Sequence, residues 1–369
     1  MLKDPNWSSN YFNTVLDEDE RSRMESEQGQ GSILLFMDGT RHARIRRALT
    51  RSVDTAMTIR LSEYAAACTA ELILELAEAD ADEDVDLIER YAVRLPLRML
   101  ARLIGIPDSD VPALSPDAIG LASMVDWKPS PDAIDSAAVV ANALQPYFFE
   151  LMKEKRRRPA DDLMSRLVRE AVERNLRYQD IVSICLLIVA AGQMTSTHMI
   201  GNGALALLRD ERARRSFVAR TADTREVVEE LLRFDNPVQL TPRAALRDIE
   251  CGGVRIPRGD LALGLIGSAN RDPDAFPSPD TLDFARRKSE SLSFGAGPHY
   301  CFGMQIAKVM GKAAFEALFF AFPGMRLATE ALEWRPTLTQ RGLSSLPVRL
   351  GPPSSTELAK LAAVAETAR

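Results

Sequence analysis

The feature that most constrains this chain is a run of 28 residues, from Ile181 to Leu208, without Asp, Glu, Lys or Arg. A helix of this length is long enough to cross a membrane. Only the first half, IVSICLLIVAAG, is strongly apolar, and the second half carries several polar side chains. A helix buried on all sides in a large protein tolerates such a mixture better than a membrane span does. The run therefore predicts a long helix, about 177–209, through the centre of a soluble protein.

Composition narrows the classes of function. With 46 Lys and Arg residues against 52 Asp and Glu residues, the net charge is −6, which argues against a nucleic-acid-binding protein. Hydrophobic residues make up 46% and charged residues 27%, as in a globular protein, so disordered and fibrous chains are excluded. The four cysteines are too few and too scattered for a disulfide scaffold or a zinc cluster. The first residues, MLKDPNWSSNYF, form no secretory signal, and we expect a cytoplasmic protein without a membrane anchor.

Helical periodicity dominates the chain as far as Pro237, and short β-type segments follow. We expect helices over 40–80, 86–105, 109–127 and 132–158, another opening at 159–162, and a further one over 224–234. Turns with Gly and Pro separate strands predicted at 238–250, 253–256 and 260–265, ahead of a helix at 303–321 and a β-type stretch at 335–350. The length suggests two or three domains, but no linker or repeat divides the chain. The sequence thus predicts one large domain over 1–350, mainly α with a minor β part, and a loosely attached, partly helical tail over 351–369.

The strongest chemical signal is the segment Phe294–Gly303, FGAGPHYCFG, which leads into a predicted helix. Backbone N–H groups at the start of a helix stabilise a thiolate. Glycines let the backbone fold around the sulfur and approach a flat ligand. Cys301 is therefore a candidate ligand for an iron ion. The alternative is a small buried cysteine without chemistry, which is the usual state of a lone cysteine.

With these residues the chain resembles the soluble bacterial branch of the cytochrome P450 family, over about residues 4–350. The family's FxxGxxxCxG loop is matched by Phe294, Gly297, Cys301 and Gly303. The resemblance implies a single cytochrome P450-type domain, with haem b between the long central helix and the helix after the cysteine. It further implies that Cys301 is the proximal thiolate ligand of the haem iron, with Phe294, Gly295 and Gly303 around the cofactor.

Two further motifs of the family are present. Its ExxR motif reads Glu230 to Arg233, and these side chains lie one helical turn apart. The resemblance implies that Arg286 joins them in a structural ion-pair network. The family's HxxxR motif reads His42 to Arg46, so both residues lie on one helical face. The haem carboxylates are then expected to bind His42, Arg46, Arg243 and His299.

On the distal side the family pattern [AG]-G-x-[DE]-T-[TS] reads Ala191, Gly192, Gln193, Met194, Thr195 and Ser196. The small residues would let the helix approach the haem, and Thr195 matches the alcohol that delivers protons to bound dioxygen. Met194 occupies the position of the family's acid. We therefore expect slower proton delivery unless Gln193 or an ordered water takes the place of that acid. The alternative for Thr195 is an ordinary helix residue without a catalytic role.

Position in the family also predicts the substrate pocket and a short N-terminus. The expected substrate contacts are 11–35, Leu187, Ala191, Val238, Leu240, Thr241, Leu343 and Ser344. Family members usually carry several tens of residues before the segment that begins here at Lys3. Either the true start lies upstream of Met1, or the chain lacks the outer strands of its sheet, in which case an exposed sheet edge would favour a homo-oligomer.

Three hypotheses for the function stay open. The first is a haem-thiolate monooxygenase that inserts one oxygen atom from O2 into a small organic substrate of secondary metabolism, with electrons from a ferredoxin and its reductase. The second keeps the haem but changes the chemistry to oxidative coupling, peroxide use, isomerisation or dehydration, because position 194 carries no acid. The third is a non-catalytic relative that stabilises another enzyme, and the presence of Cys301 and Glu230 argues against it.

Overall fold

The computed structural model describes residues 1–10, 33–80, 83–112, 114, 126–127, 130–174, 176–286 and 291–367. Two predictions concern residues outside these ranges. The substrate contacts expected at 11–35 fall mostly on residues 11–32, and most of the helix expected at 109–127 falls on residues 113 and 115–125. Both stay predictions.

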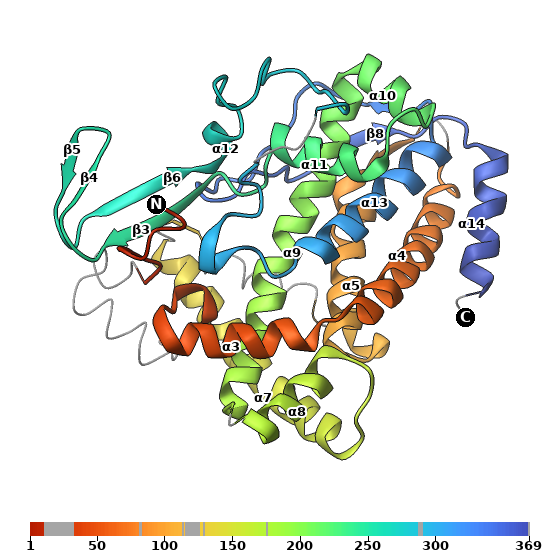
Figure 1. Cartoon of the computed structure of the whole chain (residues 1–369). Coiled ribbons are helices and arrows are strands. Elements are labelled where there is room, and N and C mark those ends of the chain that lie inside the picture. The colour runs from red at the N-terminus through yellow and green to blue at the C-terminus, as the bar shows by residue number, and fades with distance from the viewer. Residues whose placement is uncertain are drawn as a thin grey trace.

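The long uncharged run forms α9 (Tyr178–Arg209), a continuous helix through the middle of the molecule (Figure 1). The helices that pack against it include α5 (Arg94–Ile104), α11 (Thr224–Phe234) and α13 (Met304–Ala321). Among the described residues, α9 is the one helix long and apolar enough to cross a membrane, but most of it is buried by protein. The predicted central helix is confirmed.

Glycines in α9 set how closely its neighbours approach. A Cβ atom added at Gly192 would lie 2.9 Å from a terminal carbon of Leu100 in α5. A Cβ atom added at Gly203 would overlap the ring of Phe315 in α13. The absence of side chains at these two positions therefore lets α5 and α13 pack against the central helix.

The periodic stretch predicted as one helix over 40–80 is two helices, α3 (Gly39–Ser52) and α4 (Thr55–Leu76). The chain turns between them at Asp54, whose carboxylate accepts a hydrogen bond from the backbone N–H of Met57 at 2.7 Å. This N-cap begins a new helix inside a continuous periodic pattern, which is why periodicity alone did not show the break.

The helices α7 (Pro131–Arg157) and α8 (Leu163–Arg174) follow the predicted ranges within a few residues, whereas sequence reasoning missed α10 (Glu211–Val218). The other short helical elements are the one-turn α12 (Ile266–Ala269), η2 (Leu34–Phe36), η3 (Ile88–Ala92), η4 (Asp108–Asp110) and η6 (Gly297–His299).

The strands form three small antiparallel sheets among the described residues. The first, in the order β1-β3-β6, contains β1 (Trp7–Ser8), β3 (Leu240–Ala245) and β6 (Leu261–Leu265). The second, in the order β2-β8-β7, contains β2 (Asp84–Asp86), β8 (Pro347–Arg349) and β7 (Arg326–Leu327). The third is the hairpin of β4 (Ile249–Cys251) and β5 (Val254–Ile256). The register of the first sheet pairs Arg243 with Ala262, which fixes this arginine at the edge of the cavity described below.

The segment after residue 350 differs from the loosely attached tail expected from the sequence. It forms α14 (Ser355–Thr367), which packs on α4 at the edge of the molecule (Figure 1). Arg220 pairs with Glu357 at 2.9 Å, and the backbone N–H of Ser354 donates to Ala321 at 2.8 Å. The composition GlyProProSerSer predicted the loop before α14 but not its contacts, because those contacts join residues far apart in the sequence.

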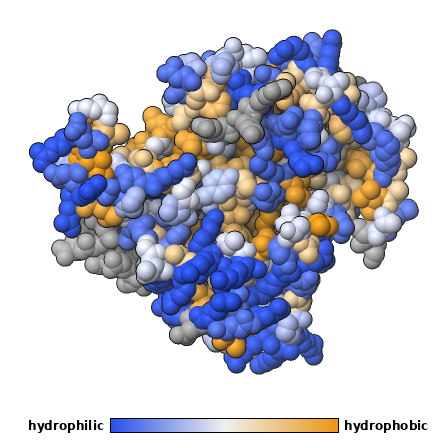
Figure 2. Space-filling view, viewed as in Figure 1, coloured by the Kyte–Doolittle hydropathy of each residue, from blue (hydrophilic) through white to orange (hydrophobic). Residues whose placement is uncertain are grey.

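One large hydrophobic core joins these helices and the second sheet, and a separate small cluster with Phe36 and Ala244 lies at the first sheet. Buried residues from α3, α4, α5, α7, α8, α9, α11 and α13 all belong to the large core. On the surface, the region over α3, α7 and α8 is mostly hydrophilic, and apolar side chains show mainly in the recesses between elements (Figure 2). The predicted class, one mainly α domain with a minor β part, is confirmed.

Candidate functional site

A cavity of about 400 Å³ lies between α9 and the loop that precedes α13. On one side it is lined by Cys301 and its loop. On the other side α9 contributes Ile184, Leu187, Ile188, Ala191, Gly192, Thr195, Ser196 and Met199. Most of the exposed wall is apolar, so the cavity suits a flat hydrophobic ligand.

The cysteine loop is shaped by two glycines. Gly295 and Gly297 have φ values of 71° and 73°, a backbone conformation that residues with a Cβ atom rarely adopt. The backbone N–H of Cys301 donates to the Phe294 carbonyl at 2.9 Å and closes the loop. The loop therefore holds Cys301 at the cavity wall, just before α13 begins at Met304.

Opposing effects act on the thiol of Cys301, whose side chain is exposed towards the cavity while protein surrounds it elsewhere. Burial raises the pKa of this thiol, while the backbone N–H groups of Gly303 and Met304 and the positive charge of Arg46 act in the opposite direction. These donors at the start of α13 are the groups that stabilise a thiolate. The side chain is thus prepared to ligate a cation in the cavity.

Four cationic or imidazole side chains from three separate elements line the same cavity: His42 and Arg46 from α3, Arg243 from β3, and His299 from η6. The His42 and His299 rings lie 4.3 Å apart between centroids. Arg46 also donates to the carbonyl of Tyr300. Burial, together with the charges of His299 and Arg46, lowers the pKa of His42 to about 4. Such a cluster binds anionic groups, so the cavity provides for carboxylates at its edge.

Behind the loop lies the buried ion-pair network that the sequence predicted. The Arg233 guanidinium donates twice to Glu230, through Nε and Nη2, each at 2.8 Å. Arg286 Nε lies 3.3 Å from the same carboxylate. Arg233 is fully buried and Glu230 is 4% exposed, so neither group has water as an alternative partner.

Sequence reasoning missed the connection between this network and the cysteine loop. Arg233 Nη1 donates to the backbone carbonyl of Asn270 at 2.8 Å. The Asn270 side chain accepts from the N–H of Leu292 at 2.8 Å and donates to Ser293 Oγ at 3.0 Å. Ser293 directly precedes the loop. No local motif marks Asn270, because its partners lie 22 and 37 residues away in the sequence.

The distal residues predicted from the sequence separate into two groups. Ala191, Gly192 and Thr195 line the cavity, whereas Gln193 and Met194 are buried outside its lining. The Gln193 amide donates to the carbonyl of Val93 at 2.8 Å, which directs this side chain toward η3 and α5. Gln193 is therefore not placed to replace the missing acid, which corrects the expectation. The Thr195 hydroxyl donates to the carbonyl of Ala191 at 2.7 Å and remains an acceptor at the cavity wall.

Some of the predicted substrate contacts line the cavity and others do not. Leu187, Val238, Leu240 and Thr241 line the cavity. Leu343 is instead fully buried in the hydrophobic core, Ser344 lies outside the lining, and the cavity is lined by Thr339 and Gln340. The reason is the pairing of Val238 with Gln340 and of Trp334 with Leu343, which turns this irregular segment in a way that sequence alone did not show.

The donor set fits haem b, a flat apolar group with two carboxylates and an iron ion. Apolar walls match its faces, the imidazole and guanidinium cluster matches its carboxylates, and a thiol faces the interior. Cys301 would ligate the iron, and His42, Arg46, Arg243 and His299 would hold the carboxylates. The fold and this site define the class of haem-thiolate proteins.

Comparisons with known proteins agree with this class. The sequence model of the family "Cytochrome P450" matches residues 223–323. The chain is 34% identical over 357 residues to the vitamin D(3) 25-hydroxylase of Pseudonocardia autotrophica, covering 95% of this chain and 85% of that protein. It is 31% identical to the 6-deoxyerythronolide B hydroxylase of Saccharopolyspora erythraea, covering 85% and 76% of the two chains. The chain belongs to the cytochrome P450 family.

Solved structures show the same relationship. The crystal structure of P450BioI in complex with a fatty-acyl acyl carrier protein has a TM-score of 0.86 and 28% identity, covering 95% of this chain and 89% of that one. The tirandamycin C-bound monooxygenase TamI has a TM-score of 0.81 and 32% identity, covering 95% and 86%. Proteins of this family bind haem b and act as oxidoreductases with redox partners and small substrates.

Proposed function

We propose that this protein is a monooxygenase that inserts one oxygen atom from O2 into a small organic substrate of secondary metabolism. The observation that carries the proposal is the placement of Cys301 and Thr195 on the walls of one apolar cavity, with four carboxylate-binding side chains at its edge. Hydroxylases of complex natural products are among its relatives. When bound, haem supplies the activation of O2 and the transfer of one oxygen atom to the substrate.

The chain's own residues would hold the haem, shape the space above it and supply a hydrogen-bonding hydroxyl. The N–H groups of Gly303 and Met304 support the Cys301 thiolate from behind. Ala191 and Gly192 keep α9 free of bulk where the substrate and O2 must fit. Because the Thr195 hydroxyl hydrogen is directed at Ala191, its oxygen lone pairs accept a hydrogen bond from water or substrate in the cavity.

Electrons would arrive from a ferredoxin. Arg44 and Arg47 are exposed on α3, the helix whose Arg46 contacts the backbone of the cysteine loop at Tyr300. A basic surface beside the thiolate ligand suits an acidic electron donor by electrostatic steering. Arg41 is less suited, because it pairs with Asp180 at 3.2 Å. A cytoplasmic location and a homo-oligomer stay predictions.

The cavity wall around Val238 and Thr339 supports an apolar substrate with a few oxygen functions. It is mostly aliphatic, with Leu187, Val238 and Leu240, and carries the polar side chains Thr241, Thr339 and Gln340. A substrate with a large apolar body and a few oxygen functions would match these groups. Relatives named for polyketide biosynthesis act in metabolism of that kind.

The reduced carbon monoxide difference spectrum tests the proposal. We expect a band at about 450 nm, and a band at about 420 nm instead would contradict native thiolate ligation. The matched control is Cys251→Ser, since Cys251 is an exposed cysteine on β4 and does not line the cavity. Cys301→Ser should lose the band, and Cys251→Ser should keep it.

A second candidate, haem-thiolate chemistry other than monooxygenation, is favoured by the distal helix. Met194 carries no acid and Gln193 points away from the cavity, so neither side chain delivers protons there. The variant Met194→Glu is compared with Met194→Gln, which has the same shape without the charge. If monooxygenation is the native reaction, Met194→Glu raises the product formed per NAD(P)H consumed. An unchanged ratio in both variants shows that the missing acid does not limit the reaction, and the argument for the alternative chemistry then falls.

A further inference from the structure

Asp38 occupies a helix-capping position but does not cap its helix. It directly precedes α3, where an aspartate normally accepts a hydrogen bond from the first turn. Asp54, Asp210 and Asp223 do so at the starts of α4, α10 and α11. The Asp38 side chain makes no such bond. Its carboxylate is used for other contacts, at the expense of a stabilising cap.

Those contacts come from two distant segments. Ser8 Oγ donates to Asp38 Oδ2, and the backbone N–H of Ser9 donates to Oδ1 at 3.2 Å. His299 Nε2 lies 3.5 Å from the same Oδ1. Burial alone would raise the pKa of Asp38, but these three donors hold the pKa well below its usual range. The side chain is therefore a carboxylate at neutral pH.

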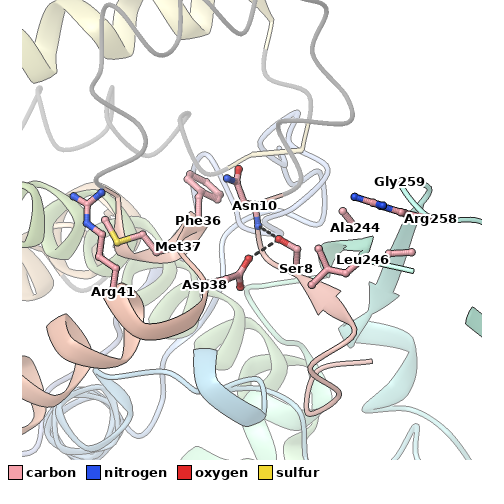
Figure 3. Close-up of a pocket in the computed structure, with 11 residues that line it drawn as sticks. Ser8, Asn10, Phe36, Met37, Asp38, Arg41, Ala244, Leu246, Arg258 and Gly259 are labelled. Carbon is pink, nitrogen blue, oxygen red and sulfur yellow. Dashed lines mark hydrogen bonds between the residues drawn. The ribbon is translucent and has the colours of Figure 1, made fainter. Parts of the chain in front are cut away.

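The position of Asp38 relative to the haem cavity is informative. His299 and His42 line that cavity, with their rings 4.3 Å apart. Asp38 lines instead a second, outer pocket of about 420 Å³, together with Ser8, Asn10 and Arg41 (Figure 3). Asp38 is thus behind His299 and touches the imidazole from the side away from the cavity.

We propose that Asp38 is a positioning residue that fixes the His299 ring, and through it the stacked His42 ring, for binding of a haem carboxylate. A carboxylate behind a ligand-binding imidazole orients that ring and selects the nitrogen that faces the ligand. The backbone N–H of Ser9 donates to Oδ1, the oxygen that faces His299, whereas Ser8 binds only the other oxygen, Oδ2. This inference rests on the proposed function, because it requires that the cavity binds haem.

The decisive variant is Asp38→Asn in the haem-containing protein. The amide keeps the shape and can exchange hydrogen bonds with the Ser8 hydroxyl, but it removes the charge opposite His299. We expect a shift of the haem-propionate bending band in the resonance Raman spectrum. We also expect haem transfer to apomyoglobin to become about 10-fold faster, since loss of a supporting partner typically weakens such a site by about 10–100-fold.

Two controls separate this role from a merely structural one. Ser8→Ala removes the contact with β1 but leaves the charge, so its Raman band should stay at the wild-type position. Asp54→Ala removes a true N-cap and should lower thermal stability without moving the band. If Ser8→Ala shifts the band as far as Asp38→Asn does, Asp38 acts only as an anchor for β1 and the proposal is overturned.

The outcomes also distinguish this inference from the proposed function. In one outcome, the wild-type protein binds haem and shows a band at about 450 nm, but Asp38→Asn changes neither the Raman band nor the rate of haem transfer. This outcome overturns the role of Asp38 alone. A wild-type protein that takes up no haem overturns both.

Discussion

The two walls of the cavity are built on different principles. On the proximal side, Glu230, Arg233, Asn270 and Ser293 form one chain of hydrogen bonds from α11 to the cysteine loop. On the distal helix, Gln193 Oε1, Asn202 Oδ1 and both ring nitrogens of His198 have no hydrogen-bond partner among the described residues. The proximal wall is held by hydrogen bonds between buried protein groups, whereas these buried atoms of the distal helix make none to the described residues.

This difference in hydrogen bonding suggests a division of roles between cofactor binding and substrate choice. A buried network in which each member depends on the others tolerates little change, so the proximal wall fixes the cofactor. The distal wall departs from the family pattern at Met194, and its polar atoms are less constrained. We therefore expect the choice of substrate and chemistry to depend mainly on α9 and the segment around Thr339.

The largest expected effect is on the proximal network. Arg233→Leu leaves Glu230 buried with the weaker contact to Arg286 and one backbone N–H donor, from Asp283. Breaking a buried pair in this way costs about 3–5 kcal/mol of stability. The matched control is Arg215→Leu, which breaks an exposed pair with Glu211 and should cost less than about 1 kcal/mol. Chemical unfolding of the haem-containing variants measures both. Similar losses in the two variants would show that the network is not what fixes the proximal wall.

A smaller, pH-dependent effect is expected on the distal helix. Burial, and the nearby charge of Arg335, lower the pKa of His198 to about 4 from an ordinary value of 6.5. The unfolded chain then binds more protons than the folded chain between these values, so stability falls as the pH drops from 6.5 to 4. This histidine alone accounts for about 3 kcal/mol of that loss.

His198→Leu removes this titration while keeping a side chain of similar size. The free energy of unfolding of the variant should therefore fall less than that of wild type between pH 6.5 and pH 4. His42 has the same kind of shift but is present in both proteins, so the difference between them reports His198. Parallel pH profiles would mean that His198 is hydrated or paired in solution, and the contrast between the walls would weaken.

Local motifs explain which parts of the site were predictable. Cys301, Glu230, Arg233 and His42 lie in short patterns with fixed spacing, and the structure places each where such a pattern requires. Asp38 and Asn270 were missed because their partners are distant in the sequence. The helices were predicted from periodicity, but not the N-cap that separates α3 from α4.

The substrate wall was the least predictable part. Thr339 and Gln340 belong to a segment without periodicity, and isolated bridges to Val238 and between Trp334 and Leu343 set its register. Such pairings depend on tertiary contacts rather than on local propensity. Sequence reasoning therefore found the cofactor and the cavity residues Leu187, Val238, Leu240 and Thr241, but it missed Thr339 and Gln340.

The smallest effect comes from two glycines of α9 that face different neighbours. Replacing either glycine by alanine favours the helix by about 1 kcal/mol. At Gly192 the new methyl group meets only the flexible end of Leu100, so Gly192→Ala should change the free energy of unfolding by less than about 1 kcal/mol. At Gly203 it meets the rigid ring of Phe315 in α13, the helix that follows the cysteine loop. Overpacking there costs about 1–3 kcal/mol, so Gly203→Ala should be the less stable variant. If the two variants are equally stable in chemical unfolding, α9 packs as tightly against α5 at Gly192 as against α13 at Gly203. The contrast between the two walls then lies in their hydrogen bonds alone.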